Sequence, residues 1–221
     1  MAHAASAELE RPGRRLAELV ALCERRLKDR FLSRSGRLYG WGIAVSYTLM
    51  MWLGFGDSSA MLRRALGTLA WLAGGMVVLS ALQNPSAPAE RGLLALVRKR
   101  GASESELANA QQLALGLRLL RVIGWPALVL AVAAGLTARE GAGPLAVLPN
   151  LLGVVVFGVV TIAVLTLSAR AALILAPARV RVTFLALVLL PHLAHAIWPS
   201  VPSIPAVLGA VLTEMSHWSG A

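Results

Sequence analysis

Long runs of residues without a charged side chain are the feature that most limits what this chain can fold into. The longest extends from Leu145 to Ala169, and it is enough residues to cross a bilayer with some tilt. Short basic stretches separate the runs. In the core of a bilayer every backbone polar group needs an internal partner, so such runs form helices. The sequence therefore predicts an all-α, polytopic membrane protein.

Six transmembrane helices are expected from these runs, with an N-terminal interfacial amphipathic helix before them and a cytoplasmic helical connection between spans two and three. Residues 1–13 are expected to be disordered, 14–37 to form the interfacial helix, and 38–221 to form the transmembrane domain. The connection between spans two and three covers about 84–120. The expected spans are about 38–55, 65–82, 121–138, 145–169, 182–198 and 204–215, of which the last is short for a crossing and is either a sixth helix or a re-entrant segment.

The net charge of +10 raises two interpretations, nucleic-acid binding and membrane topology. Topology is favoured, because the basic residues flank runs of spanning length, and cytoplasmic loops retain Lys and Arg. With the N-terminus inside, all of the 21 Lys and Arg residues except Arg63, Arg64 and Arg139 lie on the cytoplasmic side. We expect a multi-pass protein of the cytoplasmic (inner) membrane with a cytoplasmic N-terminus, in contact with lipid and without a nucleic-acid partner.

The N-terminal helix carries its apolar residues at intervals of three and four, with charged residues largely on the other side. A basic helix too charged to span is expected to lie in the cytoplasmic interface with its apolar stripe in the acyl boundary. An ordinary soluble amphipathic helix is the alternative. The stripe consists of Leu16, Leu19, Val20, Cys23, Leu27 and Phe31.

The stretch "ERGLLALVRKRGASESELANA", Glu90 to Ala110, is the main charged segment in the middle of the chain. Basic residues followed by Gly101 are typical of a helix C-terminus. Ser103 with Glu106 three residues later is the pattern of a capping box at the start of the next helix. The stretch therefore predicts a helix, a glycine turn and a second helix.

This stretch resembles the segment between the second and third spans of permeases of ATP-binding-cassette exporters of the second export family. That family has the form E-x-x-x-G-T-L-x-x-L, then Pro, Ser and Glu-Leu. Gly101 stands where many members have proline, and Leu93 replaces a common threonine. The residues at the family's spacing are Gly92, Leu94, Gly101, Ser103, Glu106 and Leu107.

Two further segments are similar to the family in their order. "RRLKDRF" resembles the elbow helix before the first span, and "LTLSARAALILAPARVRVTFLALVLLP" resembles the turn between the fourth and fifth spans. In size and topology the chain is also similar to the haem-exporter membrane subunit of cytochrome c maturation.

The resemblance implies a permease that pairs with a second copy or a related permease, is driven by a separate cytoplasmic ATPase subunit and moves its cargo by alternating access. The chain has no G-x-x-x-x-G-K-[ST], so ATP and Mg²⁺ would be held by that partner, and this chain would bind no cofactor and catalyse no reaction. Gly101 and Glu106 would set the shape of the coupling element, and its basic residues would meet acidic or backbone groups of the ATPase. The implied coupling residues are Gly92, Leu94, Leu96, Arg98, Lys99, Arg100, Gly101, Ser103, Glu106 and Leu107.

Two alternatives stay open: a non-transporting accessory or scaffold subunit, and a haem-binding membrane protein. The second depends on His192 and His195, three residues apart in the fifth expected span, where imidazoles could also line a pathway. No matching histidine pair recurs on another span, so no metal site is expected. Small residues that could permit close helix contacts are Gly74, Gly75, Gly116, Gly124, Gly153 and Gly158.

Overall fold

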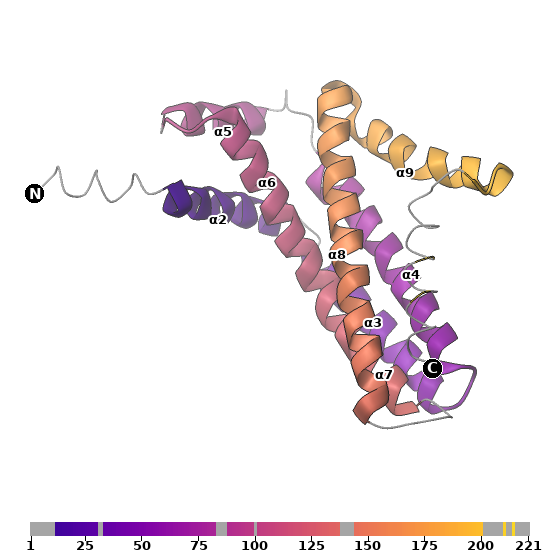
Figure 1. Cartoon of the computed structure of the whole chain (residues 1–221). Coiled ribbons are helices and arrows are strands. Elements are labelled where there is room, and N and C mark those ends of the chain that lie inside the picture. Colours follow the sequence, from indigo (N-terminus) through magenta and orange to yellow (C-terminus); the bar gives the residue numbers. More distant parts are fainter. Residues whose placement is uncertain are drawn as a thin grey trace, which may run out of the picture.

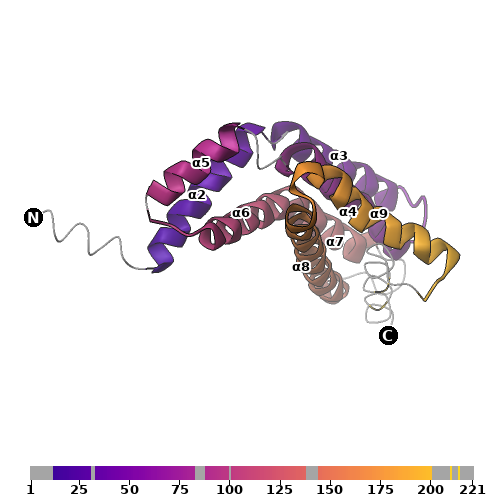
Figure 2. The ribbon, with the colours of Figure 1, turned by 90° about the horizontal axis from the view of Figure 1, so that it is seen from above.

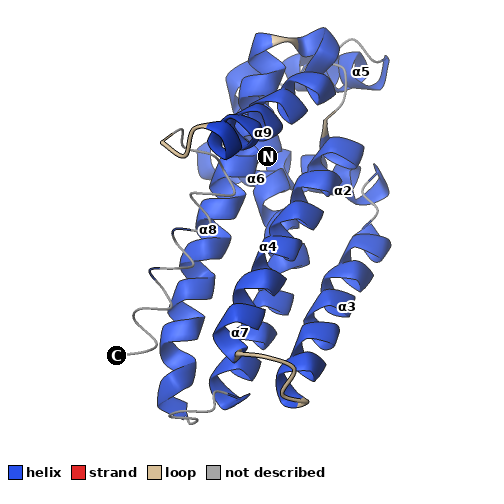
Figure 3. Cartoon of the chain, turned by 90° about the vertical axis from the view of Figure 1, so that its right-hand side faces the viewer, coloured by secondary structure: helices blue, strands red, loops and turns tan. Residues whose placement is uncertain are grey.

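The computed structural model describes residues 12–30, 33–82, 88–99, 101–137, 144–200 and the single positions 210 and 214. Within these residues all regular secondary structure is helical, which confirms the all-α prediction. Four rods run side by side as a bundle (Figures 1 and 3). They are α3 (Ser33–Trp52), α4 (Ser58–Met76) with the π-helical turn η1 (Val77–Ala81), the rod made by α6 (Glu104–Leu119), η2 (Leu120–Gly124) and α7 (Trp125–Thr137), and α8 (Pro144–Leu175).

Four segments of the described residues are long and apolar enough to cross a membrane. They are Ser58–Leu79, Glu104–Thr137, Val147–Leu175 and Pro177–His195. The first expected span, 38–55, coincides with α3 up to Trp52; α3 lies in the bundle beside α4 and α7 but is not one of the four. The sixth, 204–215, falls almost entirely outside the described residues.

The bundle is apolar on both its inside and its outside. Its core is a continuous cluster that includes Leu66, Leu69, Leu130 and Phe157. Large apolar side chains also cover the outer surface, among them Val45, Leu49, Leu152, Val155 and Val159. A water-soluble bundle would bury its apolar stripe and expose polar groups. This bundle has the surface that a lipid environment requires.

A stripe of small residues brings α3 close to its neighbours. Gly36, Gly40 and Ala44 recur every four residues and are all buried. A Cβ atom at Gly36 would lie 1.9 Å from Met76 Cε, and one at Gly40 would lie 2.8 Å from the Val122 carbonyl oxygen. Small residues at this spacing let helix backbones approach closely, which is how membrane helices commonly associate.

The third rod is one uninterrupted helix that runs through the boundary expected between the cytoplasmic connection and the third span. We expected a cytoplasmic connection up to Leu120 and a separate span over 121–138, but the helix continues from Glu104 to Thr137 through η2. At 1.5 Å per residue its 34 residues measure about 51 Å. The hydrocarbon core of a bilayer is about 30 Å thick, so part of this helix extends beyond it.

The last helix, α9 (Val180–Ile197), does not run alongside the other helices of the bundle, as a membrane span would. Its length and composition would let it cross a membrane, but it turns away from α8 and runs across the end of the bundle (Figures 1 and 2). Pro177 starts a short 3₁₀ turn, η3 (Pro177–Arg179), after α8 ends. Arg181 then donates from Nε to the Leu82 carbonyl oxygen at 3.0 Å, which fixes the start of α9 against the end of η1.

At the opposite end of the bundle, Asp57 caps the first turn of α4. Its carboxylate accepts hydrogen bonds from the Ala60 amide at 2.8 Å and from the Ser59 hydroxyl. These bonds, with a smaller contribution from the charge of Arg63, lower the pKa of Asp57 below its ordinary value. A second tie at this end is the Ser58 hydroxyl, which lies 3.1 Å from the Thr137 carbonyl oxygen.

The lowered pKa of Asp57 gives a pH prediction. The stabilising contribution of the carboxylate is fully present above the unfolded-state pKa of about 4 and is lost as the pH falls through the lower folded-state pKa. We expect wild type to melt above Asp57→Asn at neutral pH, with a difference equivalent to about 0.5–1 kcal/mol, and the two melting temperatures to converge below about pH 3. Thermal unfolding in detergent from pH 7 to pH 2.5 measures this. A difference that persists at the acidic limit would contradict it.

Candidate functional site

A helical arm projects from the bundle and holds the motif found in the sequence. The arm consists of α2 (Pro12–Arg30), α5 (Pro88–Lys99) and the first half of α6. Figures 1 and 2 place α2 and α5 side by side, away from α8 and α9. Helix α2 begins at Pro12, slightly before the predicted start at Arg14, in agreement with the preference of proline for the first helical turn.

The predicted helix, glycine turn and helix are confirmed in the arm. Gly101 has φ of 70°, in the left-handed region, and the next amide, that of Ala102, donates to the Val97 carbonyl oxygen at 3.1 Å to close the end of α5. The capping box is complete. The Glu106 amide donates to Ser103 Oγ at 3.2 Å, and the Ser103 amide donates to Glu106 Oε2 at 2.7 Å.

The predicted coupling residues separate into an exposed set and a packed set. Leu107 is buried and Leu94 is half-buried, both against α2, while Glu106 is half-buried in the capping box. Leu96 and Arg98 lie in α5, but the structure does not describe their side chains. Arg100 lies outside the described residues. The exposed set is Gly92, Lys99, Gly101 and Ser103, joined by Arg91.

The apolar stripe of α2 faces protein. Leu19 and Cys23 are 8% and 3% exposed, in an arm core completed by Val97, Ala102 and Leu107. The expectation that this stripe enters the acyl boundary is therefore corrected, because α5 and α6 cover it. Phe31 lies outside the described residues. The other members of the stripe, Leu16, Val20 and Leu27, pack around the same core.

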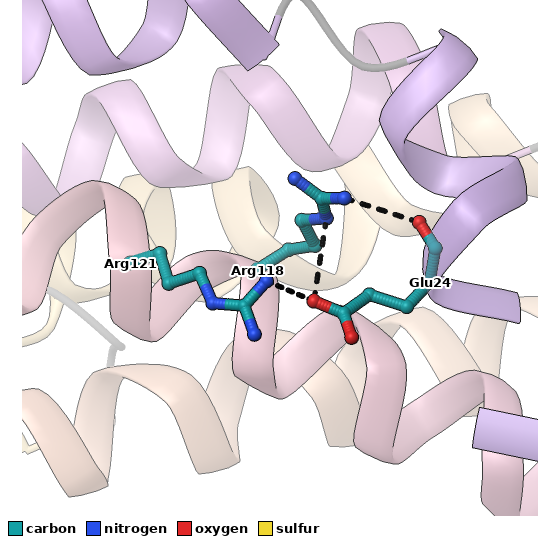
Figure 4. Close-up of polar contacts among 3 residues, drawn as sticks. All are labelled: Glu24, Arg118 and Arg121. Atoms are coloured by element: carbon teal, nitrogen blue, oxygen red, sulfur yellow. Dashed lines mark hydrogen bonds and ion pairs between the residues drawn. The ribbon is translucent and has the colours of Figure 1, made fainter. Parts of the chain in front are cut away.

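Two arginines of the long helix bind one glutamate of α2, an arrangement that sequence reasoning missed (Figure 4). Arg121 Nη1 pairs with Glu24 Oε1, and Arg118 Nε lies 3.9 Å from the same oxygen. Arg118 also donates from Nη2 to the Glu24 backbone carbonyl oxygen at 3.2 Å. The side chains of Arg118 and Glu24 are 11% and 19% exposed. Low exposure strengthens such a pair relative to one in open water.

The two histidines lie away from the arm on α9 and are not brought together with any predicted coupling residue. The His192 ring meets the edge of Trp71, with ring centroids 6.1 Å apart and an interplanar angle of 68°. Among the described residues no group of three or more His, Cys, Asp and Glu side chains could hold a metal ion.

A polar contact also joins the arm to α8. Arg170 donates from Nη1 to Gln112 Oε1 at 3.0 Å and to Asn109 Oδ1 at 3.2 Å, both on α6. The same helix that begins at the exposed glycine turn is therefore fixed to α2 on one side and to α8 on the other.

No protein-family model, no curated protein and no solved structure matches this chain.

Proposed function

We propose that the chain is the membrane-spanning permease subunit of an ATP-driven exporter, and that its arm docks a separate cytoplasmic ATPase subunit. The observation that carries the proposal is the long helix, which begins at the exposed Gly101 turn and continues without a break into the apolar bundle. A force applied at the turn would reach the bundle core along this one helix.

The exposed face of the arm has the chemistry that a protein partner requires. Arg91 and Lys99 stand on the outside of α5, and Gly101 and Ser103 form the turn that follows. The arm core behind this face is well packed, so the turn is held in one shape and needs little ordering when a partner binds. ATP and Mg²⁺ belong to the partner in this proposal, since the chain has no phosphate-binding loop of the P-loop type.

The apolar bundle core bears on where a transport pathway could lie. Among the described residues, only Ser58, Thr161 and Thr166 are buried polar side chains, and the remaining core is apolar. A pathway for a polar cargo does not fit inside one copy. We therefore place it between two copies or between this chain and a related permease, in the inner membrane with the arm on the cytoplasmic side, where the positive charge is concentrated.

The same closed core favours a second candidate, a scaffold subunit that assembles with a complex and transports nothing. Docking through the arm is common to both candidates. Nucleotide-dependent cargo movement belongs only to the first.

Docking at the exposed face of the arm is tested by reversing the charges of Arg91 and Lys99. We expect Arg91→Glu with Lys99→Glu to reduce retention of a P-loop ATPase on the chain, purified from native membranes, by about tenfold or more, because rim and interface charges mismatched with a partner cost about a kcal/mol each. Arg64→Glu is the matched control, since Arg64 is an exposed arginine at the opposite end of the bundle. Photocrosslinking from position 99, with mass spectrometry, identifies the captured chain and checks for the P-loop.

The outcomes separate the candidates. A P-loop ATPase that is retained and then lost on charge reversal of the arm, with ATP hydrolysis stimulated in the complex, supports the permease. A P-loop ATPase that is retained but whose rate of ATP hydrolysis does not change in the complex favours the scaffold. Retention unchanged by the double reversal and by Gly101→Val would overturn docking at the arm.

A further inference from the structure

We infer that α9 lies in one leaflet of the membrane, the leaflet on the arm side of the bundle, and does not cross the bilayer. Its partner is phospholipid, with acyl chains against the outer face of the helix and phosphate groups near its arginine-bearing start. The inference requires that the bundle lies in a bilayer, but not that the chain docks an ATPase or transports a cargo.

Two contacts fix the depth of α9 relative to α4. At the start of α9, Arg181 donates to the Leu82 carbonyl oxygen at 3.0 Å, which places this end of the helix at the arm-side end of the bundle. Further along, the His192 ring meets the edge of Trp71 on α4. By His192, therefore, α9 has descended only to about the level of Trp71.

The rest of α9 is too short to reach the other end of the bundle. Ser58, the first residue of α4, stands 13 residues before Trp71, which is about 20 Å along the helix. Each leaflet contributes about 15 Å of hydrocarbon, so Trp71 and His192 belong to the arm-side leaflet. Only five residues, about 8 Å, separate His192 from the end of α9 at Ile197. Even a helix parallel to α4 would end about 12 Å short of Ser58.

The direction of α9 makes its end shallower still. The helix runs across the end of the bundle, and its far end projects beyond the other helices (Figures 1 and 2). Of the four segments long enough to cross a membrane, the one that contains α9 has the smallest buried share, 17% against 33% or more. Most of its surface is therefore open to the surrounding medium.

The outer face of α9 is apolar along its whole length. Val180, Phe184 and Val188 point into the bundle and are at most 8% exposed. Large exposed apolar patches mark surfaces that contact a membrane or another protein. The exposed side chains on the rest of the helix are Val182, Leu185, Leu189, Leu190, Leu193 and Ile197.

The residues at the two ends of α9 favour phospholipid as the occupant of this face. Residues 177–200 contain no Asp or Glu, whereas Arg179 and Arg181 are both exposed at the start of the helix. Basic residues beside an apolar helix are attracted to the phosphate groups of the membrane surface. At the other end Trp198 is 66% exposed, and tryptophan rings are enriched at the headgroup level. Because α9 is too short to reach the second interface, both ends meet the same one.

Spin-label depth measurements test the placement in vesicles of phosphatidylcholine and phosphatidylglycerol that hold no other protein. Depth is read from the accessibility of each label to oxygen and to a water-soluble nickel complex. Cys23 is replaced by alanine in every variant, so that only the introduced cysteine reacts. The labelled positions on the outer face of α9 are Val182, Leu189 and Ile197.

Helix α8 supplies the matched control for a helix that crosses. Leu148, Val155 and Leu167 are exposed along its length and should give a shallow, a deep and a shallow label. Val155 stands 11 residues from the start of α8, about 16 Å, and so lies near the middle of the bilayer. We expect the label at Leu189 to be shallower than that at Val155 by about 5 Å or more, with access to oxygen above that of a label in water.

The sidedness of Ser200 gives an independent result. Lys99→Cys marks the arm side, and Phe55→Cys, in the exposed loop between α3 and α4, marks the opposite side. Sealed vesicles of each orientation are treated with a maleimide that does not cross membranes. We expect Ser200→Cys to stay unlabelled wherever only Phe55→Cys reacts. A six-span arrangement predicts the reverse, because a fifth span would carry Ser200 to the Phe55 side.

Four results would overturn the inference. A label at Leu189 as deep as that at Val155, or reaction of Ser200→Cys from the Phe55 side, would show that α9 crosses. A label at Leu189 as open to the nickel complex as one at Lys99 would place α9 in water. An immobilised label at Leu189 without access to oxygen would show that a second copy covers this face. The α8 labels report separately whether the bundle lies in the bilayer, and no ATPase is present, so failure of the docking proposal would leave this result unaffected.

Discussion

Gly135→Ala is expected to lower the stability of the chain more than any other single methyl addition to the glycines of the bundle that we consider. The new Cβ would lie 2.7 Å from Val147 Cα, 2.7 Å from Val147 Cγ2 and 2.9 Å from Val147 N. Two of these atoms are backbone, which cannot rotate away as a side chain can. The start of α8 must therefore move away from α7, the neighbour with which it makes its most extensive contact. We expect a loss of about 3 kcal/mol, at the upper end of the cost of overpacking.

Gly158→Ala is the matched control for Gly135→Ala. Gly158 lies in the middle of α8, and a Cβ there would meet nothing within 4 Å. Because alanine is about 1 kcal/mol better than glycine in a helix interior, this variant should be neutral or more stable. Thermal unfolding followed by size-exclusion fluorescence in detergent compares the two. Equal melting temperatures for Gly135→Ala and the parent would show that α7 and α8 do not approach as closely as described.

Gly40→Ala is expected to have the second-largest effect. Its Cβ would press on the Val122 carbonyl oxygen at 2.8 Å, on the bundle side of η2. Separating α3 from the long helix by the distance needed would loosen the whole stripe formed with Gly36 and Ala44. We expect a loss of about 2 kcal/mol, within the range for small-to-large changes in packed cores.

Gly42→Ala controls for the effect of Gly40→Ala on α3 itself. Gly42 is exposed, two residues further along the same helix, and a Cβ there would meet nothing within 4 Å. Thermal unfolding should show a loss only in Gly40→Ala. A Gly42→Ala variant that is destabilised as much would mean that α3 is sensitive to alanine for reasons other than contact with Val122.

Local signals in the sequence were the ones that predicted structure correctly. Gly101, Ser103 and Glu106 act within a few residues of one another, so the glycine turn and the capping box could be recognised without knowing the fold. The apolar runs likewise identify helices long enough to cross a membrane, because length and composition are properties of one segment.

Long-range pairing could not be predicted from the sequence. Arg118 and Arg121 stand beside an apolar run, and charges usually lie where a helix leaves the bilayer. Their partner is Glu24, which is distant in sequence, and its carboxylate lets both arginines belong to one continuous helix. A sequence without its fold does not show which acidic residue meets which basic one.

The sequence also did not show which helices pack against the apolar stripe of α2. The periodicity of α2 predicted an apolar stripe correctly, but not that α5 and α6 cover it. Gly36, Gly40 and Ala44 stand at a regular spacing of four that is visible in the sequence, but the predicted close contacts involved other glycines, such as Gly74 and Gly75. For α9, composition permitted a span, whereas Pro177 and the bond from Arg181 to Leu82 set its direction.

The length of α6 gives the arm mechanical advantage over the bundle. Its 16 residues place the Ser103 cap about 24 Å from the start of η2, as calculated from the helical rise. A tilt of α6 by about 10° would therefore carry the glycine turn through about 4 Å relative to η2. Conversely, a displacement of a few ångströms at the glycine turn would rotate the long helix by only a few degrees at the point where α3 contacts Val122.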